Sequence, residues 1–263
     1  MTTTAAPARV GSVRILGFAY GVAAYVAFLG VFLYAVAFVE DAKVTVGGTL
    51  LVPRTIDRGG PDTGTATAVV VDVLLLSLFA VQHSVMARTS FKRWLTRHLP
   101  ASVERSTFVL AASACLALLE WGWHPVTGTV WDVSGAGPRG VLRAVSLAGF
   151  GLVLASTFLI NHFDLFGLRQ VTAALRGRTL PAYTLVTPLW YAVVRHPIYL
   201  GFLIAFWVTP TMTAGHLLFA AMTTGYILVG IWFEERDLVA QFGEAYRAYR
   251  RRVPMLVPGR RRA

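Results

Sequence analysis

The chain has 263 residues, of which 56% are hydrophobic and only 14% are charged, and its formal net charge is +11. A soluble domain has about 25% charged residues, so this composition excludes an ordinary soluble protein and indicates one that lies in a membrane. The single cysteine, Cys115, excludes disulfide bonds, cysteine-rich zinc sites and iron–sulfur clusters within one chain.

Long uncharged stretches predict the membrane-spanning helices, because a helix needs about 20 mostly apolar residues to cross a bilayer. The first, 15–39, is too long for the core of a signal peptide and is predicted to be retained. Similar stretches follow at 68–87, 104–123 and 140–161. A longer one, 197–233, is interrupted by "TPTMTAG" (209–215), which indicates a tight turn between two helices. The sequence therefore predicts an all-α integral membrane protein with about six transmembrane helices and a C-terminal cytosolic helical segment.

Two segments are predicted to lie outside these helices. Residues 1–12 form an N-terminus that is expected to be flexible. The 40–67 segment is rich in glycine and proline and has mixed charge, which is typical of a loop outside the membrane. Its "VPRTID" stretch could alternatively cover a site.

Positively charged residues gather in three segments, at 88–105, 169–195 and 247–262. The loops expected on the other side of the membrane, 124–139 and 209–215, carry almost none. The positive-inside rule therefore places the basic segments and both termini in the cytosol. The basic tail favours attraction to anionic lipid rather than to nucleic acid.

Polar side chains inside or beside a membrane span are costly, so they are candidates for function. In this sequence they fall in four sets, all predicted to lie at the cytosolic face. The sets are Gln82 with His83; Asn161, His162 and Asp164; Arg195 with His196; and Glu234 with Glu235.

Several of these residues also have a structural interpretation. His83, near a helix end, could simply lie at the membrane interface. Asn161 could cap or link helices, and Asp164 could pair with Arg169. Glu234 and Glu235 are adjacent and point about 100° apart on a helix, so one of them is expected to pair with a basic residue. A further polar residue, Asp72, is predicted to be buried and is given no role.

The residues around 195–201 are suited to an amino-acid ligand with a positively charged sulfur. Pro197 favours the first turn of a helix, where free backbone N–H groups and Arg195 attract a carboxylate. Glu234 or Glu235 would attract an ammonium group. Tyr199 and Tyr246 offer aromatic faces to a sulfonium, and Gly201 permits close approach of backbone or ligand. S-adenosyl-L-methionine has all of these groups, and no metal is needed.

Two motifs add a family resemblance. The stretch "RHPIYLG" (195–201), followed after a hydrophobic hairpin by "EERDLVAQFGEAYRAYRRRVPMLVP" (234–258), resembles the membrane methyltransferases that act on isoprenylcysteine or phospholipids. In those enzymes the two motifs form the S-adenosyl-L-methionine pocket. The resemblance therefore implies that the donor is bound by a set of seven or eight residues. They are Arg195, His196, Tyr199, Gly201, Glu234 or Glu235, Tyr246 and Arg247.

A resemblance that covers nearly the whole chain is to the bacterial methanethiol S-methyltransferases. It rests on "LFAVQHSVMAR" (78–88), "ERSTFVL" (104–110), "STFLINHFDLFGLRQV" (156–171) and "FLIAFWVTPTMTAGHLLFA" (202–220). It implies an enzyme of the bacterial inner membrane that makes dimethyl sulfide from methanethiol, a small volatile thiol. We expect one domain over 1–263, with the acceptor side in 13–187 and the donor side in 188–258. The oligomeric state is left open.

Methyl transfer to a thiol requires the thiolate, so a base must accept the thiol's proton. His83 and His162 are the candidates; we take His83 as the base, with Asn161, His162 and Asp164 as supporting residues. Alternative acceptors are another thiol, a prenylcysteine carboxylate or a lipid headgroup. The non-enzyme alternatives are a haem protein, ligated by paired histidines such as His83 and His162, and a small-solute transport component.

Overall fold

The computed structural model describes residues 11–182 and 184–259. Most of the 1–12 segment therefore lies outside the described residues. The described part of the chain is mostly helical, and its strands form only two small two-stranded sheets.

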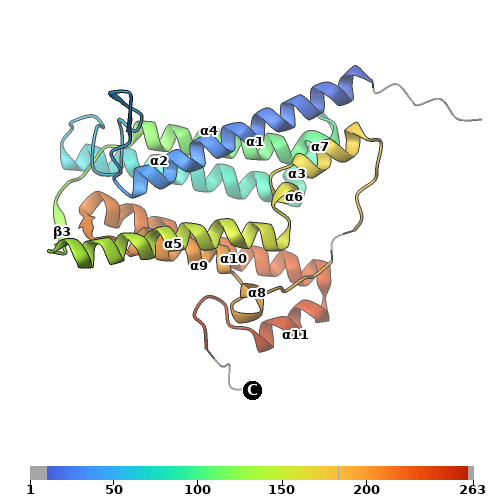
Figure 1. Cartoon of the computed structure of the whole chain (residues 1–263). Helices are drawn as coiled ribbons and strands as arrows, with labels where there is room; N and C mark the ends of the chain where they lie inside the picture. The colour runs from blue at the N-terminus through green and yellow to red at the C-terminus, as the bar shows by residue number, and fades with distance from the viewer. Residues whose placement is uncertain (1–10, 183, 260–263) are drawn as a thin grey trace, which may run out of the picture.

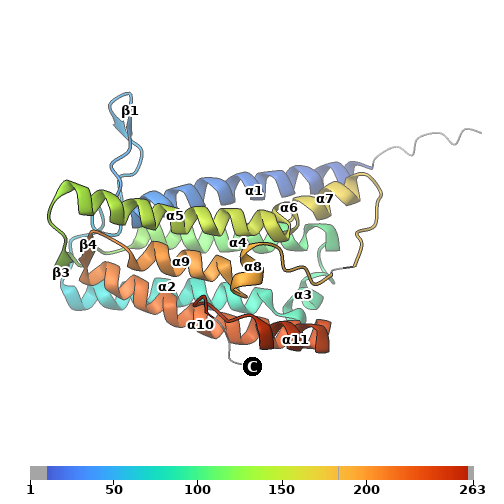
Figure 2. The same cartoon turned by 60° about the horizontal axis from the view of Figure 1, so that its bottom comes forward.

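Long helices run side by side along the molecule (Figures 1 and 2). Within the described residues, five of them are long and apolar enough to cross a membrane, which confirms an all-α membrane protein. They are α1 (Ser12–Val39), α2 (Thr65–Ala87), α4 (Ala101–Gly122), α5 (Ala136–Ile160) and α10 (Ala214–Phe242).

The remaining predicted span differs from the other five. It forms α9 (Pro197–Trp207), an apolar helix of 11 residues. At 1.5 Å per residue it is about 16 Å long, roughly half the thickness of the hydrocarbon core. Proline stands in its first turn, as predicted.

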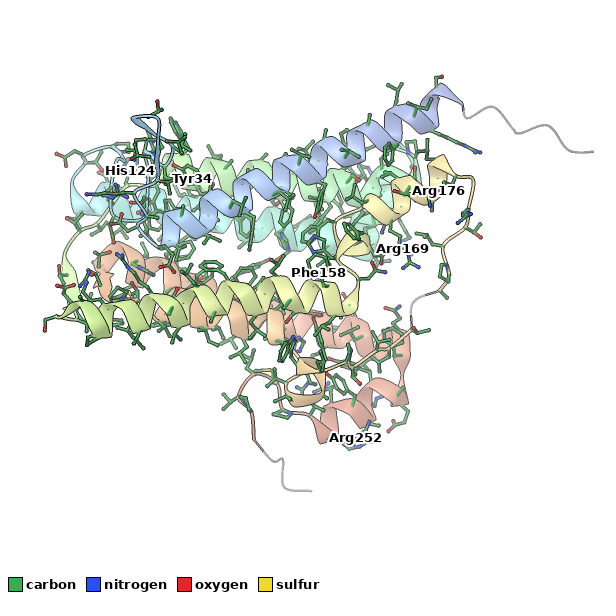
Figure 3. The ribbon with its side chains drawn as sticks, viewed as in Figure 1. Tyr34, His124, Phe158, Arg169, Arg176 and Arg252 are labelled. Carbon is green, nitrogen blue, oxygen red and sulfur yellow. The ribbon has the colours of Figure 1, made fainter. Side chains whose placement is uncertain are left out.

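The two ends of the bundle carry different short elements. One end, here called the loop end, holds β1 (Thr45–Val46), β2 (Thr49–Leu50), β3 (Thr129–Asp132) and β4 (Thr211–Thr213). The other, here called the basic end, holds α3 (Thr89–Leu95), α6 (His162–Leu165), α7 (Leu168–Leu175), α8 (Trp190–Val193) and α11 (Glu244–Arg252). Figure 3 places Arg169, Arg176 and Arg252 at the basic end, opposite Tyr34 and His124. The three basic segments predicted from the sequence therefore lie at the basic end as far as the structure describes them, while Arg54, Arg58 and Arg139 belong to the loop end.

The turn predicted between α9 and α10 is present and includes a strand that the sequence did not indicate. Strand β4 pairs antiparallel with β3, with Thr213 opposite Thr129 and Thr211 opposite Asp132. Arg139 binds Asp132 at 2.6 Å and also donates to the Thr211 hydroxyl, which fixes the start of α5 against this turn.

The 40–67 segment is held against the loop end. Arg58 pairs with Asp41 at 2.7 Å, and Thr213 donates a hydrogen bond of 2.6 Å to Asp57. The Trp123 indole donates to the carbonyl of Ile56, whose side chain is fully buried. The segment therefore closes the loop end and lies far from the basic end, where the polar candidates were placed.

Helices α5 and α9 approach very closely, because each presents a glycine to the other. A Cβ on Gly201 would meet the Gly149 carbonyl oxygen at 2.6 Å, and a Cβ on Gly149 would meet the Gly201 carbonyl oxygen at 2.7 Å. Ser146 on α5 donates a further hydrogen bond to the Ala205 carbonyl on α9. This contact holds α9 in the bundle despite its shortness.

Asp72 is fully buried in α2 and accepts a hydrogen bond of 2.9 Å from the backbone N–H of His124. Since His124 follows α4, this bond links α2 to the end of the neighbouring helix. It lies at the loop end, so it is a connection between elements away from the candidate site.

Candidate active site

A buried ionic cluster joins the start of α9 to the last turns of α10. The Arg195 guanidinium lies 2.6 Å from the Glu235 carboxylate, and their side chains are only 2% and 9% exposed. His196 lies 3.2 Å from the same carboxylate, and Arg250 reaches its other oxygen at 3.2 Å. Two of the four predicted sets therefore meet by direct contact.

The local fold explains why the cluster forms. The backbone N–H groups of Arg195 and His196 donate to the carbonyls of Pro254 and Met255, so the chain after α11 returns alongside the start of α9. The Tyr249 hydroxyl also donates to the Tyr191 carbonyl in α8. The C-terminal helical segment is therefore part of the site rather than an appended tail.

Most of the N–H donors of Arg195 are engaged in contacts within the protein. Its Nε and Nη2 bind Glu235, and its Nη1 donates to the carbonyls of Val253 and Arg250. A guanidinium has five N–H donors, and most of them are used here. The predicted binding of a donor carboxylate by Arg195 would require it to exchange these contacts.

The two adjacent glutamates have different environments, as their 100° separation predicts. Glu235 is the one that pairs with basic residues. Glu234 is 44% exposed, and its carboxylate lies 3.7 Å from His196. Glu234 therefore retains carboxylate surface that a cationic ligand can reach.

The other predicted donor residues lie around this cluster in different ways. The Tyr199 ring lies against the His196 ring, with 5.6 Å between centroids. Tyr246 is buried, and within the described residues its hydroxyl has no hydrogen-bond partner; burial raises the pKa of this phenol. Arg247 is 54% exposed and lies 3.6 Å from Glu244. Gly201 faces α5, so its lack of a side chain is explained by the helix contact.

A shallow pocket of about 290 Å³ opens beside the cluster. It is lined by Trp232, Glu235, Arg236, Val239 and Arg250. Arg250 was not predicted from the sequence, although it directly follows "FGEAYRAY" (242–249) and lies one turn after Tyr246.

His83 lies in an aromatic setting on α2. Its ring stacks on Phe79 and lies 4.9 Å from the Phe108 ring and 6.3 Å from the Tyr226 ring, measured between centroids. Its Nδ1 is buried and has no hydrogen-bond partner within the described part of the chain. Gln82, next to it, donates to the sulfur of Met86. Tyr226, which links His83 to α10, was not singled out from the sequence.

His162 has both ring nitrogens engaged. Thr157 uses its one hydroxyl hydrogen toward the Leu154 carbonyl, so the 2.8 Å contact with His162 Nδ1 requires the histidine to donate. In neutral His162 the Nε2 then accepts from the Tyr25 hydroxyl at 2.7 Å. Burial lowers the pKa of His162, which favours this neutral form. Neither nitrogen is available to ligate haem iron without breaking a hydrogen bond.

Asn161 and Asp164 make the structural contacts that the sequence suggested, a helix cap and an ion pair. The Asn161 side chain caps α6 by accepting from the Asp164 backbone N–H, and Asn161 has a positive φ of 143°. The Asp164 carboxylate lies 3.7 Å from Arg169 and also accepts from Gln170. Both residues therefore shape the connection between α5 and α7.

Comparison with known proteins identifies the family. A family model described as NnrU protein matches residues 72–256, which include every predicted site residue. Methanethiol S-methyltransferase 1 of Bradyrhizobium diazoefficiens is 53% identical over 248 residues, covering 94% of this chain and 84% of the relative. Methanethiol S-methyltransferase of Mycobacterium tuberculosis is 53% identical over 245 residues, covering 93% and 97%. The chain belongs to the methanethiol S-methyltransferase family.

The resemblance drawn from the sequence motifs is thereby confirmed for the methanethiol S-methyltransferase family. A more distant relative, Nurim of Danio rerio, is 28% identical over 65% of this chain and 64% of its own length. No solved structure shows significant similarity to the chain.

Proposed function

We propose that this chain transfers a methyl group from S-adenosyl-L-methionine to methanethiol and releases dimethyl sulfide. The observation that carries the proposal is the similarity of more than 50% identity, over more than 90% of the chain, to proteins named for this reaction. We further propose that the protein lies in the bacterial cytoplasmic membrane with the basic end in the cytosol, where the methyl donor is made.

The residues at the basic end fit such a donor. Glu234 offers carboxylate surface to an ammonium group, and the buried Tyr246 hydroxyl has no hydrogen-bond partner among the described residues. Arg247 is more than half exposed and can meet a carboxylate. The faces of Tyr199 and Tyr246 suit a sulfonium. In this proposal Arg195 and Glu235 form a buried ion pair that holds α9, α10 and the C-terminal chain together.

The donor supplies a methyl group on a positively charged sulfur, and the protein must supply a thiolate in line with it. The His83 Nδ1 is buried and has no hydrogen-bond partner in the part of the chain that the structure describes, so it can accept the thiol's proton. Phe79, Phe108 and Tyr226 pack around the ring, which is half-buried. His162 is proposed to support the wall of the site, since its two nitrogens are already bonded.

The direct test is the formation of dimethyl sulfide. Cells that express the chain are given methanethiol, and the headspace is analysed by gas chromatography; purified protein is then assayed with and without S-adenosyl-L-methionine. Dimethyl sulfide that depends on both the chain and the donor supports the proposal. Product formed only from a prenylcysteine or a lipid would instead assign a different acceptor.

A further inference from the structure

An apolar groove of about 390 Å³ lies between α2 and α10. Phe79, Val81 and Ser84 line it from α2, and Met222, Gly225 and Tyr226 line it from α10. Both helices are long and apolar enough to span the membrane, and Val81 at the margin is exposed. The groove therefore opens toward lipid rather than toward water.

The inner wall of the groove is shared with the proposed base. Phe79 and Tyr226 line the groove, and the same two rings contact the His83 ring, at centroid distances of 5.5 Å and 6.3 Å. Behind this wall, His83 Nδ1 is buried and has no hydrogen-bond partner among the residues that the structure describes. A molecule with an aliphatic body in the groove and an acidic proton at its inner end would match both features.

We propose that this groove admits the acceptor from the bilayer and holds its alkyl chain, so that straight-chain thiols longer than methanethiol are also methylated. This inference rests on the proposed function. Methanethiol takes the space of about two water molecules at ~30 Å³ each, which is a small part of the groove. Each added methylene favours transfer of the thiol from water to lipid, which concentrates longer thiols at the groove's mouth.

The reaction is the same for every chain length. The thiol's proton passes to His83 Nδ1, and the thiolate sulfur forms a bond to the methyl carbon. The bond between that carbon and the positively charged sulfur breaks, and its electron pair stays on the donor's sulfur as a neutral thioether. The products are an alkyl methyl sulfide, the demethylated donor and one proton, which His83 returns to water.

Gly225 offers a way to fill the groove without disturbing the helices. It lines the groove, and a Cβ at this position would meet nothing within 4 Å. The test compares kcat/KM for methanethiol and 1-butanethiol in wild type and Gly225→Leu. We expect the wild type to form butyl methyl sulfide and the variant to lower the butanethiol-to-methanethiol ratio at least about tenfold. Gly30→Leu is the matched control, because Gly30 is an exposed helical glycine with equally open surroundings on α1, and its ratio should not change.

A second measurement does not depend on turnover. In a Cys115→Ser background, Gly225→Cys carries a nitroxide label, and methyl butyl sulfide is added without a methyl donor. A groove that holds alkyl chains will slow the label's motion, whereas a label at Gly30→Cys will not respond. An unchanged nitroxide spectrum, or an unchanged ratio in Gly225→Leu, overturns the groove proposal while leaving methanethiol methylation intact. A wild type that makes no dimethyl sulfide overturns the proposed function itself.

Discussion

Arg195 and Glu235 form a buried ion pair, with 2.6 Å between the guanidinium Nη2 and the carboxylate Oε1. The first residue precedes α9 and the second belongs to the last turns of α10, so the pair ties the two sides of the helical hairpin together. Arg250 from α11 shares the same carboxylate. One glutamate thus connects three parts of the chain, while its neighbour Glu234 faces a different direction.

Substitution of Glu235 should mainly reduce stability, whereas substitution of Glu234 should mainly reduce donor binding. Glu235→Ala leaves Arg195 buried without its counter-ion, which typically costs about 3–5 kcal/mol, so we expect a large fall in thermal stability and in yield. Glu234→Gln removes a half-exposed charge, so its melting temperature should stay close to that of the wild type. It should weaken S-adenosyl-L-methionine binding about tenfold or more, because a charge-assisted contact to the ammonium group is lost.

Calorimetric unfolding and equilibrium binding of the donor to purified protein measure these two effects separately. The assignment of the two roles is wrong if Glu235→Ala is as stable as the wild type, or if Glu234→Gln binds the donor normally.

Substitution of His83 tests the proposed base. His83→Ala should lower turnover at least about 100-fold, because general-base catalysis typically contributes 10²–10⁴. Donor affinity should change little, since the ring lies among Phe79, Phe108 and Tyr226 rather than in the ionic cluster. Gln82→Ala, which alters the adjacent residue on the same helix, is the matched control and should keep its turnover. Normal dimethyl sulfide formation by His83→Ala would remove this histidine from the mechanism.

The neutral state of His162 predicts a stability that depends on pH. Burial lowers the pKa of His162 in the folded protein, whereas the unfolded chain retains a value near 6.5. Below about pH 6.5 the unfolded state therefore binds a proton at His162 more readily than the folded state does. Proton binding then favours unfolding, so the free energy of unfolding decreases as the pH falls. We expect the melting temperature to decrease from pH 7 to pH 5, and to decrease less in His162→Gln.

Thr157→Val is the companion to that experiment, since it removes the acceptor of the Nδ1 hydrogen without changing the titrating group. It should lower stability at pH 7 by roughly 1–3 kcal/mol, the cost of a buried donor without a partner. Equal pH profiles for wild type and His162→Gln would contradict the inference about His162.

The sequence was sufficient for the membrane class and for the location of the polar residues. Uncharged stretches marked the five long helices, and the distribution of arginine and lysine marked the basic end. The possible capping role of Asn161 and the possible pairing of Asp164 with Arg169 were both confirmed. These features follow from local spacing, which a single sequence contains.

The direction in which each side chain points could not be predicted in the same way. Adjacent glutamates must diverge on a helix, but only the packing of α9, α10 and α11 shows that Glu235 faces inward. The hydrogen bonds that Arg195 donates to the backbone carbonyls of Val253 and Arg250 likewise depend on where the chain returns after α11. The pairing of β3 with β4 also joins segments far apart in sequence, and neither has a clear strand pattern.

Gly201 gives a test that separates helix packing from donor binding. A methyl group there would meet the Gly149 carbonyl oxygen at 2.6 Å and a Val153 methyl at 2.8 Å, and the first of these is backbone that cannot move aside. We therefore expect Gly201→Ala to lower stability by about 1–3 kcal/mol, as overpacked interiors do. Gly230→Ala is the matched control, because its nearest new neighbour is the Tyr199 hydroxyl at 3.9 Å, and it should be near neutral. If Gly201→Ala instead keeps its melting temperature and loses only donor affinity, then this glycine contacts the donor, and the close approach of α5 and α9 is not what requires it.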